Sequence, residues 1–136
     1  MSVIVDASVA LKWFLAEEGS EAAEILRRDG QLYAPDLVLP ELANALWKAV
    51  RRSLIPQAQA LVVPGVAAKA FTGLIPSAQL AERALAISIA LNHAAYDAFY
   101  IALAELLRTE VVTADARLLR KVKRTRFSKF VAPLSP

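Results

Sequence analysis

Short apolar runs alternate along the chain with longer stretches in which apolar side chains recur every three or four residues. The short runs predict buried strands, and the longer stretches predict helices. The strands are expected at residues 3–5, 32–34, 71–75, 110–113 and 130–132. The helices are expected at residues 9–14, 21–28, 40–52, 57–63, 78–91, 95–107 and 116–123. Strands that alternate with helices favour an α/β sandwich around a mostly parallel sheet.

Polar residues, proline and glycine mark the ends of the predicted elements. Asp6 or Ser8 can cap the helix that follows the first strand, because a short polar side chain accepts hydrogen bonds from the first helical N–H groups. Ser77 is expected to cap the helix at 78–91 in the same way. Pro64 and Gly65 are expected to interrupt the helix that starts at residue 57, since neither residue favours a helix interior.

Composition limits the class of protein. A chain of 136 residues is long enough for one domain, expected to span residues 1–136. Cysteine is absent, which excludes disulfides and thiolate metal sites. Polar or charged residues interrupt every apolar stretch, and no basic region precedes the first one, so we expect neither a membrane span nor a signal peptide. A cytoplasmic protein is the simplest interpretation.

The net charge of +3 is unevenly distributed. No acidic residue follows Asp115, whereas seven basic residues do: Arg117, Arg120, Lys121, Lys123, Arg124, Arg126 and Lys129. The earlier part of the chain is therefore acidic. A basic end can attract a polyanion such as a nucleic acid. The alternative is that these charges only solvate a helix face, and the sequence alone leaves both interpretations open.

Four acidic residues stand at predicted element ends or on an apolar face. Asp6 and Asp115 follow strands and Glu41 lies in the first turn of a helix, where helix capping or the helix dipole would also explain an acid. Asp97 is harder to explain in this way, because it shares a helix face with apolar residues at positions 101 and 104. A charge on such a face is rare unless a basic side chain or a metal ion pairs with it.

Together, the four acids predict a cation site. The carboxyl ends of parallel strands share one edge of a sheet, where ligands gather. Carboxylates crowded at that edge would repel one another unless a cation intervened. Oxygen ligands favour a hard ion such as Mg²⁺ or Mn²⁺, which can activate water and hold a phosphate. The single histidine, His93, makes a histidine-rich metal site impossible.

Four stretches of the chain resemble the PIN-domain nucleases, especially the VapC-type toxins of toxin–antitoxin pairs. They are VDASVALKW at residues 5–13, AP at 34–35 with LPELANAL at 39–46, HAAYDAFYIALA at 93–104 and VTADARL at 112–118. The resemblance implies a three-layer α/β/α sandwich with a mostly parallel sheet of about five strands. It also implies a homodimer, an endoribonuclease activity that depends on Mg²⁺ or Mn²⁺, and inhibition by a cognate antitoxin protein.

The resemblance also assigns roles to residues. It places the catalytic and metal-binding acids at Asp6, Glu41, Asp97 and Asp115. Asp6, Asp97 and Asp115 would hold the ion directly or through water, and Glu41 would either bind it or orient the attacking water.

Further residues would support these acids or bind the substrate. By the same resemblance, the hydroxyl groups of Ser8 and Thr113 would support the metal or its waters. Our candidates for holding the RNA backbone are Arg117, Arg120 and Lys121, for which a solvated helix face remains the alternative. Aromatic side chains can stack on bases, but core or interface packing is the favoured interpretation of Trp13, Trp47 and Tyr96.

Two questions stay open at this point. One is whether the chain is an enzyme or a catalytically weak module that uses the same fold to hold RNA or an antitoxin. A phosphatase is disfavoured, because Asp6 is not followed by a second acid at position 8. A receiver domain is disfavoured, because it would need paired acids near the start and a lysine after a late strand, and the chain shows neither clearly. The other is the excess of apolar residues, which are candidates for a dimer surface or for a groove that receives an antitoxin helix. They are Leu11, Phe14, Leu46, Val50 and residues 61–63.

Overall fold

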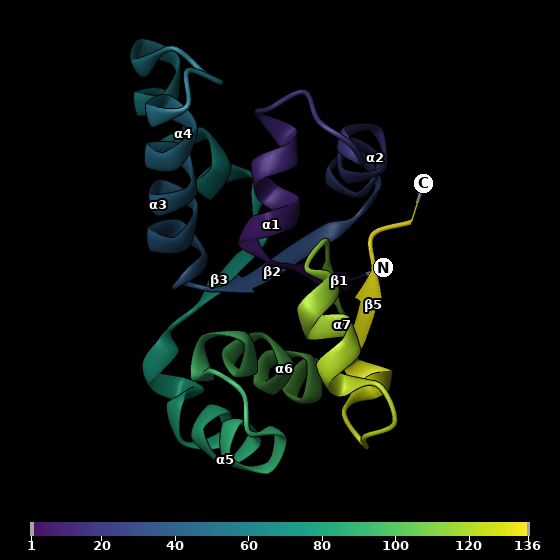
Figure 1. The fold of residues 1–136 in the computed structure, drawn as a ribbon. Coiled ribbons are helices and arrows are strands. Elements are labelled where there is room, and N and C mark those ends of the chain that lie inside the picture. Colours follow the sequence, from purple (N-terminus) through teal and green to yellow (C-terminus); the bar gives the residue numbers. More distant parts are fainter. Residues whose placement is uncertain (1, 136) are drawn as a thin grey trace.

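A parallel sheet of five strands forms the centre of the molecule (Figure 1). The structure is a computed structural model that describes residues 2–135. The strands are β1 (Ser2–Val5), β2 (Gln31–Pro35), β3 (Gly73–Ile75), β4 (Val111–Thr113) and β5 (Val131–Pro133). Their order across the sheet is β3-β2-β1-β4-β5, and every neighbouring pair is parallel. This confirms the predicted sheet and all five predicted strands, with ends shifted by one or two residues.

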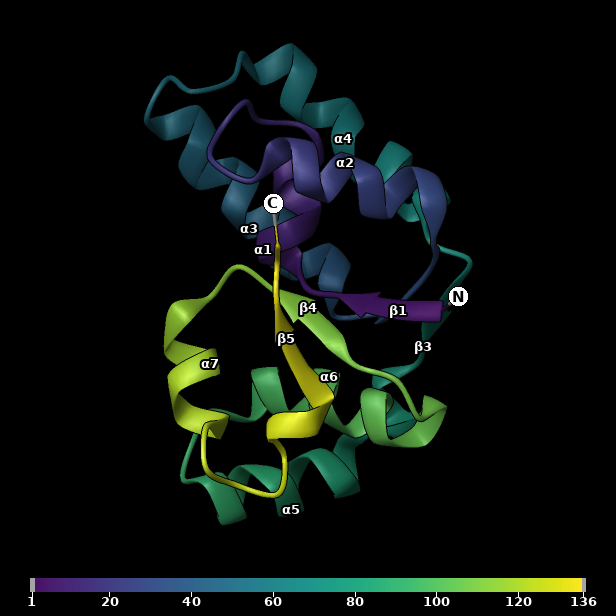
Figure 2. The same ribbon diagram turned by 90° about the vertical axis from the view of Figure 1, so that its right-hand side faces the viewer.

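Helices cover both faces of the sheet, which confirms the predicted three-layer sandwich (Figures 1 and 2). One layer contains α1 (Ala7–Ala10), α2 (Ser20–Asp29), α3 (Val38–Arg51) and α4 (Gln57–Ala70). The other contains α5 (Ala81–Leu91), α6 (Ala95–Leu107) and α7 (Ala116–Val122). Short 3-10 helices occur at η1 (Leu11–Trp13), η2 (Ser77–Gln79) and η3 (Ser128–Phe130). Within the described residues, no helix has both the length and the apolar composition needed to cross a membrane.

The two central strands are apolar because helices enclose them from both sides. Ile4 and Val5 of β1 and Val111 of β4 have no exposed surface. The register pairs Ile4 with Val111 and Val5 with Val112. Strands buried on both faces are expected to be continuously apolar rather than alternating. The polar residues that follow these strands therefore lie just outside the core, at the carboxyl edge of the sheet.

The order in which the chain adds strands to the sheet reverses between β1 and β4. From β1 the chain proceeds outward to β2 and β3, and it then returns to β4 and β5 on the other side of β1. In open parallel sheets, ligands bind beyond the carboxyl ends of the strands at such a switch point. Asp6 directly follows β1 and Asp115 lies two residues after β4, so the topology brings both to this place.

The predicted interruption at Pro64 is wrong, because α4 continues through it to Ala70. Val63 and Ala67 of α4 are buried against Leu42 and Leu46 of α3. This packing outweighs a cost of roughly 3 kcal/mol for proline inside a helix. Gly65 lies beside Pro64 on the exposed side, where an added Cβ atom would meet no other atom within 4 Å.

The predicted cap at Ser77 is also wrong. The backbone N–H of Ser77 donates to Asp36 Oδ1 at 3.1 Å, and its hydroxyl donates to the same oxygen. Ser77 therefore begins η2 and links the segment before α5 to the loop after β2. α5 starts only at Ala81, three residues later than predicted.

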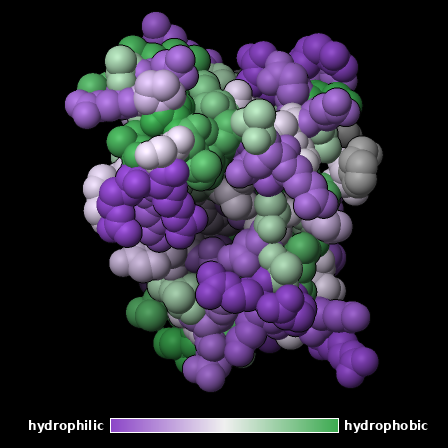
Figure 3. All heavy atoms as spheres, turned by 45° about the horizontal axis from the view of Figure 1, so that its top comes forward, coloured by the Kyte–Doolittle hydropathy of each residue, from purple (hydrophilic) through white to green (hydrophobic). Residues whose placement is uncertain are grey.

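Several large apolar side chains of the described residues remain exposed, and seven of them lie on two pairs of neighbouring helices. The first, the α3–α4 group, comprises Trp47, Leu61, Val62 and Val66, each more than half exposed. Hydrophobic side chains gather at the upper left of Figure 3, over the region of α3 and α4. The second, the α5–α6 group, comprises Leu85, Ile89 and Tyr96. Of the predicted surface candidates, Leu46 and Val63 instead belong to a core cluster against which Leu11 and Phe14 pack.

Candidate active site

Asp6 is a buried acid at the switch point between β1 and β4. Its carboxylate caps α1 by accepting the Val9 N–H at 3.2 Å, and it accepts the Ser8 hydroxyl at 2.5 Å. The Thr113 hydroxyl donates to its second oxygen. Only 7% of Asp6 is exposed. Burial raises the pKa of its carboxyl above the ordinary value, against the three hydrogen bonds that lower it.

Ser8 and Thr113 connect the turn after β1 to the loop after β4. The Ala114 N–H donates to Ser8 Oγ at 3.0 Å, and the Asp115 N–H donates to Thr113 Oγ1 at 3.0 Å. Each hydroxyl therefore accepts from the β4–α7 loop while it donates to Asp6. The structure thus places both predicted supporting residues in direct contact with Asp6.

Glu41 reaches the same region from the first turn of α3. Its Oε1 accepts a hydrogen bond of 2.6 Å from the hydroxyl of Tyr100, a residue of α6 that is 1% exposed. Burial raises the pKa of Glu41, and the negative charges of Asp97 and Asp6 raise it further. Burial also raises the pKa of the Tyr100 hydroxyl well above its ordinary value, and the charge of Glu41 adds to this effect.

Asp97 lies in the first turn of α6 and pairs with His93. The His93 Nε2 and Asp97 Oδ2 atoms are 2.6 Å apart, four residues apart in sequence. The negative charge of Asp97 contributes to the raised pKa values of both Asp6 and Glu41. The structure therefore brings three of the four predicted acids, Asp6, Glu41 and Asp97, within electrostatic reach of one another.

Asp115 stands apart from these three acids. Its carboxylate caps α7 by accepting the Arg117 N–H at 2.9 Å, and the Arg117 side chain lies 3.7 Å away. Asp115 does not figure among the charges that shift the pKa of Asp6 or Glu41. Asp115 is connected to Asp6 only indirectly: its backbone N–H donates to the Thr113 hydroxyl, which in turn donates to Asp6.

The donor chemistry of the site fits a hard cation held partly through water. Among residues 2–135, no three acidic or histidine side chains are arranged so that they could hold a metal ion by themselves. Mg²⁺ rarely needs such an arrangement, because it usually keeps several waters and binds one or two carboxylates. Burial is the main reason why the pKa values of Asp6 and Glu41 are raised, and a cation would offset the smaller contribution that comes from repulsion between the acids.

Basic side chains begin next to this site. The predicted RNA-binding residues Arg117, Arg120 and Lys121 are exposed along α7, whereas Leu118 and Val122 of the same helix are buried. α7 therefore presents its charges to solvent directly after Asp115. The structure leaves these three side chains accessible to a polyanion.

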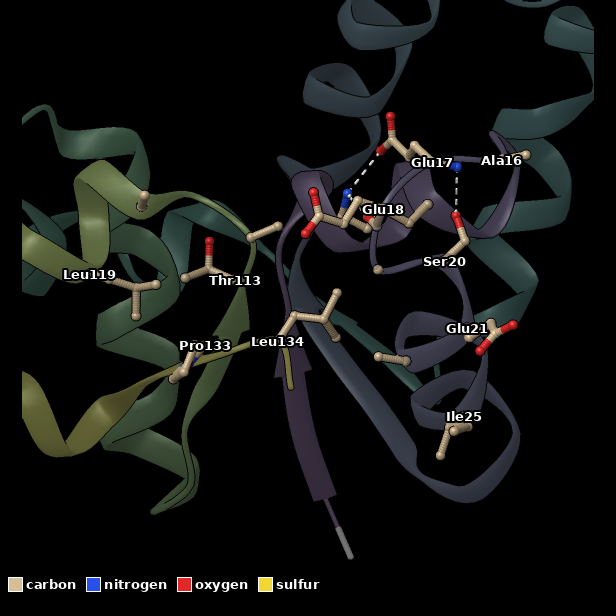
Figure 4. Close-up of a pocket in the computed structure, with 15 residues that line it drawn as sticks. Ala16, Glu17, Glu18, Ser20, Glu21, Ile25, Thr113, Leu119, Pro133 and Leu134 are labelled. Atoms are coloured by element: carbon tan, nitrogen blue, oxygen red, sulfur yellow. Dashed lines mark hydrogen bonds and ion pairs between the residues drawn. The ribbon is translucent and has the colours of Figure 1, made fainter. Parts of the chain in front are cut away.

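A groove of about 1050 Å³ opens on another side of the β4–α7 loop (Figure 4). Glu17, Glu18 and Glu21 lie along one wall, and Leu119 and Thr113 lie across from them. None of the three clustered acids Asp6, Glu41 and Asp97 lines it. Lys12 also lines the groove and pairs with Glu17 at 3.1 Å, which leaves Glu18 and Glu21 as its unbalanced charges. This groove is therefore not the candidate active site, because it lacks the clustered acids and its remaining charges would repel a polyanion.

The predicted aromatic residues divide between the core and the surface. Trp13 packs against Phe71, and its indole N–H donates to the Ala23 carbonyl at 2.9 Å. This confirms the favoured interpretation for Trp13. Trp47 is 53% exposed and Tyr96 is 68% exposed, so both remain free to contact another molecule.

The sequence did not assign roles to Tyr100 and His93. Tyr100 lies one helical turn after Asp97 on α6, so the two side chains share a helix face. His93 precedes α6 and stands four positions before Asp97. That spacing was the available signal for His93. No sequence signal pairs Tyr100 with Glu41, because the contact joins residues 59 positions apart.

Comparison with known families identifies the fold. A family model for the PIN domain matches residues 3–124. Ribonuclease VapC3 of Pyrobaculum aerophilum is 34% identical over 124 residues, which cover 89% of this chain and 95% of the relative. Ribonuclease VapC9 of Mycobacterium tuberculosis is 34% identical over 116 residues, which cover 85% of this chain and 87% of that protein.

A solved structure agrees with these relationships. The crystal structure of PAE2754 from Pyrobaculum aerophilum superposes with a TM-score of 0.70 and a sequence identity of 26%. The match covers 92% of this chain and 82% of the crystallised chain. The similarity therefore extends over nearly the whole fold described above.

Proposed function

The chain belongs to the PIN domain family, and from this premise we propose that it is a metal-dependent endoribonuclease that acts as the toxin of a toxin–antitoxin pair. Its relatives are named as VapC ribonucleases. The observation that carries the proposal is the cluster of Asp6, Glu41 and Asp97 at the switch point of the sheet. A binding module would have no need to keep three mutually repelling carboxylates there.

The carboxylates have distinct tasks in this proposal. Asp6 and Asp97 would hold Mg²⁺ or Mn²⁺, and Asp115 would contribute through a water molecule. When bound, such an ion supplies a Lewis acid for the phosphate and lowers the pKa of a water. Glu41 would bind the ion or accept a proton from the attacking water. Its raised pKa suits that second task, because a general base works best when its pKa lies closer to the operating pH.

Ser8 and Thr113 support this arrangement by fixing Asp6. Their hydroxyls donate to opposite oxygens of its carboxylate, so the side chain has one orientation. A carboxylate fixed in this way loses little conformational entropy when it binds an ion. The same two residues also fix the loop that carries Asp115.

The RNA backbone would lie against α7. Arg117, Arg120 and Lys121 provide exposed positive charges that start beside Asp115. The acidic groove of Figure 4 would keep the substrate from the other side of the β4–α7 loop. The charge distribution therefore favours a single approach of RNA to the carboxylates.

Protein partners would cover the exposed apolar groups. We propose a homodimer and a cognate antitoxin, because the apolar side chains of the α3–α4 and α5–α6 groups are in contact with water. An antitoxin helix laid into an apolar groove would bury such side chains. A cytoplasmic location follows from the proposed RNA substrate and antitoxin.

Metal-dependent cleavage tests this function against the alternative of a catalytically weak module that binds RNA or the antitoxin. Purified protein would be incubated with a panel of structured RNAs in Mn²⁺, in Mg²⁺ and in EDTA. Our proposal predicts defined cleavage products in either metal and none in EDTA. RNA binding without cleavage in every condition would favour the binding module instead.

A further inference from the structure

The hydroxyl of Tyr100 lies where the two helical layers meet beyond the ends of the central strands. Tyr100 belongs to α6 and its hydrogen-bond partner Glu41 belongs to α3, helices that cover opposite faces of the sheet (Figure 1). The donor and acceptor atoms are 2.6 Å apart, which is a short hydrogen bond of the kind that ionised acceptors form. This bond therefore links two acid-bearing helices across the site.

The hydrogen bond distinguishes the two oxygens of Glu41. The tyrosine hydroxyl has one hydrogen, which it donates to Oε1. Among the described residues, no other side chain or backbone group donates to the Glu41 carboxylate. Oε2 therefore remains available to an ion or a water molecule. Because Tyr100 holds Oε1 in place, the position of Oε2 is also fixed.

Without this bond, Glu41 would turn away from the other acids. The charges of Asp97 and Asp6 repel its carboxylate, and a glutamate side chain has several accessible rotamers. Tyr100 itself is only 1% exposed, so packing fixes its ring. A fixed donor can hold a mobile carboxylate against this repulsion.

A packing role alone does not require the hydroxyl. Phenylalanine would fill the same space, and burying a hydroxyl is unfavourable unless it forms a hydrogen bond. The only described partner of the Tyr100 hydroxyl is a carboxylate of the candidate site. We therefore infer that Tyr100 is a positioning residue that holds Glu41 in place for the cation and its water, an inference that rests on the proposed function.

Manganese binding in solution tests this inference without relying on catalysis. Mn²⁺ would be titrated by calorimetry into wild-type protein, Tyr100→Phe, Glu41→Gln and the double variant. Loss of a partner that orients a metal ligand typically weakens metal affinity by about 10- to 100-fold, and we expect this loss in Tyr100→Phe. Tyr33→Phe is the matched control, because the hydroxyl of this half-buried tyrosine forms no hydrogen bond within residues 2–135.

The double variant shows whether Tyr100 acts through Glu41. If it does, adding Tyr100→Phe to Glu41→Gln weakens Mn²⁺ binding no further, because coupled residues are not additive. Equal affinities of wild type and Tyr100→Phe would overturn the positioning role and leave the proposed function intact. No Mn²⁺ binding by wild-type protein would overturn both. Failure of Tyr100→Phe to fold, seen by circular dichroism, would overturn the inference, since the hydroxyl would then serve the fold.

Discussion

Thr113 donates its hydroxyl hydrogen to Asp6, although 107 positions separate the two residues in the sequence. Thr113 ends β4 and Asp6 follows β1, so the bond joins the first strand to the strand at which the chain returns to the centre of the sheet. Both residues are buried. This contact aligns the two halves of the sheet at the place where the acids converge.

Replacing Thr113 by valine should destabilise the protein at neutral pH. Valine has the same shape, but it cannot donate to Asp6 or accept the Asp115 N–H. A lost hydrogen bond to a buried charged group costs about 1–3 kcal/mol, so the free energy of unfolding should fall by that amount. Urea denaturation measures it. Thr113→Ser retains the hydroxyl and should recover most of the loss, and a Thr113→Val protein as stable as wild type would refute the role of this bond.

Replacing Asp6 by asparagine should stabilise the metal-free protein at pH 7. The pKa of Asp6 is raised in the folded state, so its contribution to stability is complete below the unfolded pKa of roughly 3.9 and is lost as the pH rises through the folded pKa. Asparagine does not titrate and also caps helices. The Nδ2 group of asparagine cannot accept one of the two hydroxyl hydrogens that Asp6 accepts, and this loss opposes the gain, so we expect a net gain of about 0.5 kcal/mol in EDTA at pH 7.

The dependence of this gain on pH identifies its cause. The difference between Asp6→Asn and wild type should shrink as the pH falls toward the unfolded pKa of roughly 3.9, because the pKa of Asp6 is raised in the folded state and its carboxyl takes up a proton before the unfolded chain does. Asp29→Asn is the control, because Arg28 lowers the pKa of Asp29 and its replacement should give no gain at neutral pH. A difference that stays constant between pH 4 and 7 would contradict this explanation.

The sequence predicted those parts of the fold that depend on local pattern. Residues 95–107 form a helix with the predicted ends, and Asp97 lies beside the buried Ile101, as its position on the helix face required. Asp6 lies at the switch point because the order of the parallel strands fixes where β1 ends, and Glu41 comes within electrostatic reach of it from the first turn of α3. The resemblance to a known family supplied the roles of these acids, which local pattern alone left open.

Long-range packing explains what the sequence could not reveal. The cost of Pro64 is a local property, but the burial of Val63 and Ala67 against α3 depends on how two helices meet. The hydrogen bond between Tyr100 and Glu41 likewise depends on two helices from opposite layers. The sequence of a single segment does not show which distant helix it will pack against.

Removal of positive charge from α7 should weaken RNA binding in a manner that depends on salt. Each alanine replacement of Arg117, Arg120 or Lys121 should lower the slope of log affinity against log salt concentration by about 0.7–0.9. Filter binding in EDTA measures this without cleavage. Arg28→Ala is the control, since Arg28 is exposed on α2 and paired with Asp29. Unchanged slopes in all three α7 variants would place the RNA elsewhere.

Charged substitutions in the exposed apolar groups should show which group forms the dimer surface. Leu61→Lys alters the α3–α4 group and Ile89→Lys alters the α5–α6 group, and both residues are more than 70% exposed, so the fold should tolerate either change. We expect one substitution to convert a dimer to a monomer of half the mass, as measured by light scattering. A dimer retained in both variants would exclude both groups as the self-association surface.

The rate of RNA cleavage by Asp97→Asn is the most direct test of the proposed nuclease site. Asp97 is the acid whose charge reaches both Asp6 and Glu41, and asparagine preserves its size. Under single-turnover conditions in Mg²⁺, we predict that the variant cleaves at least about 100-fold more slowly than wild type, which corresponds to about 2.7 kcal/mol of lost transition-state stabilisation. Equal rates for the two proteins, purified identically, would contradict a carboxylate-based nuclease site.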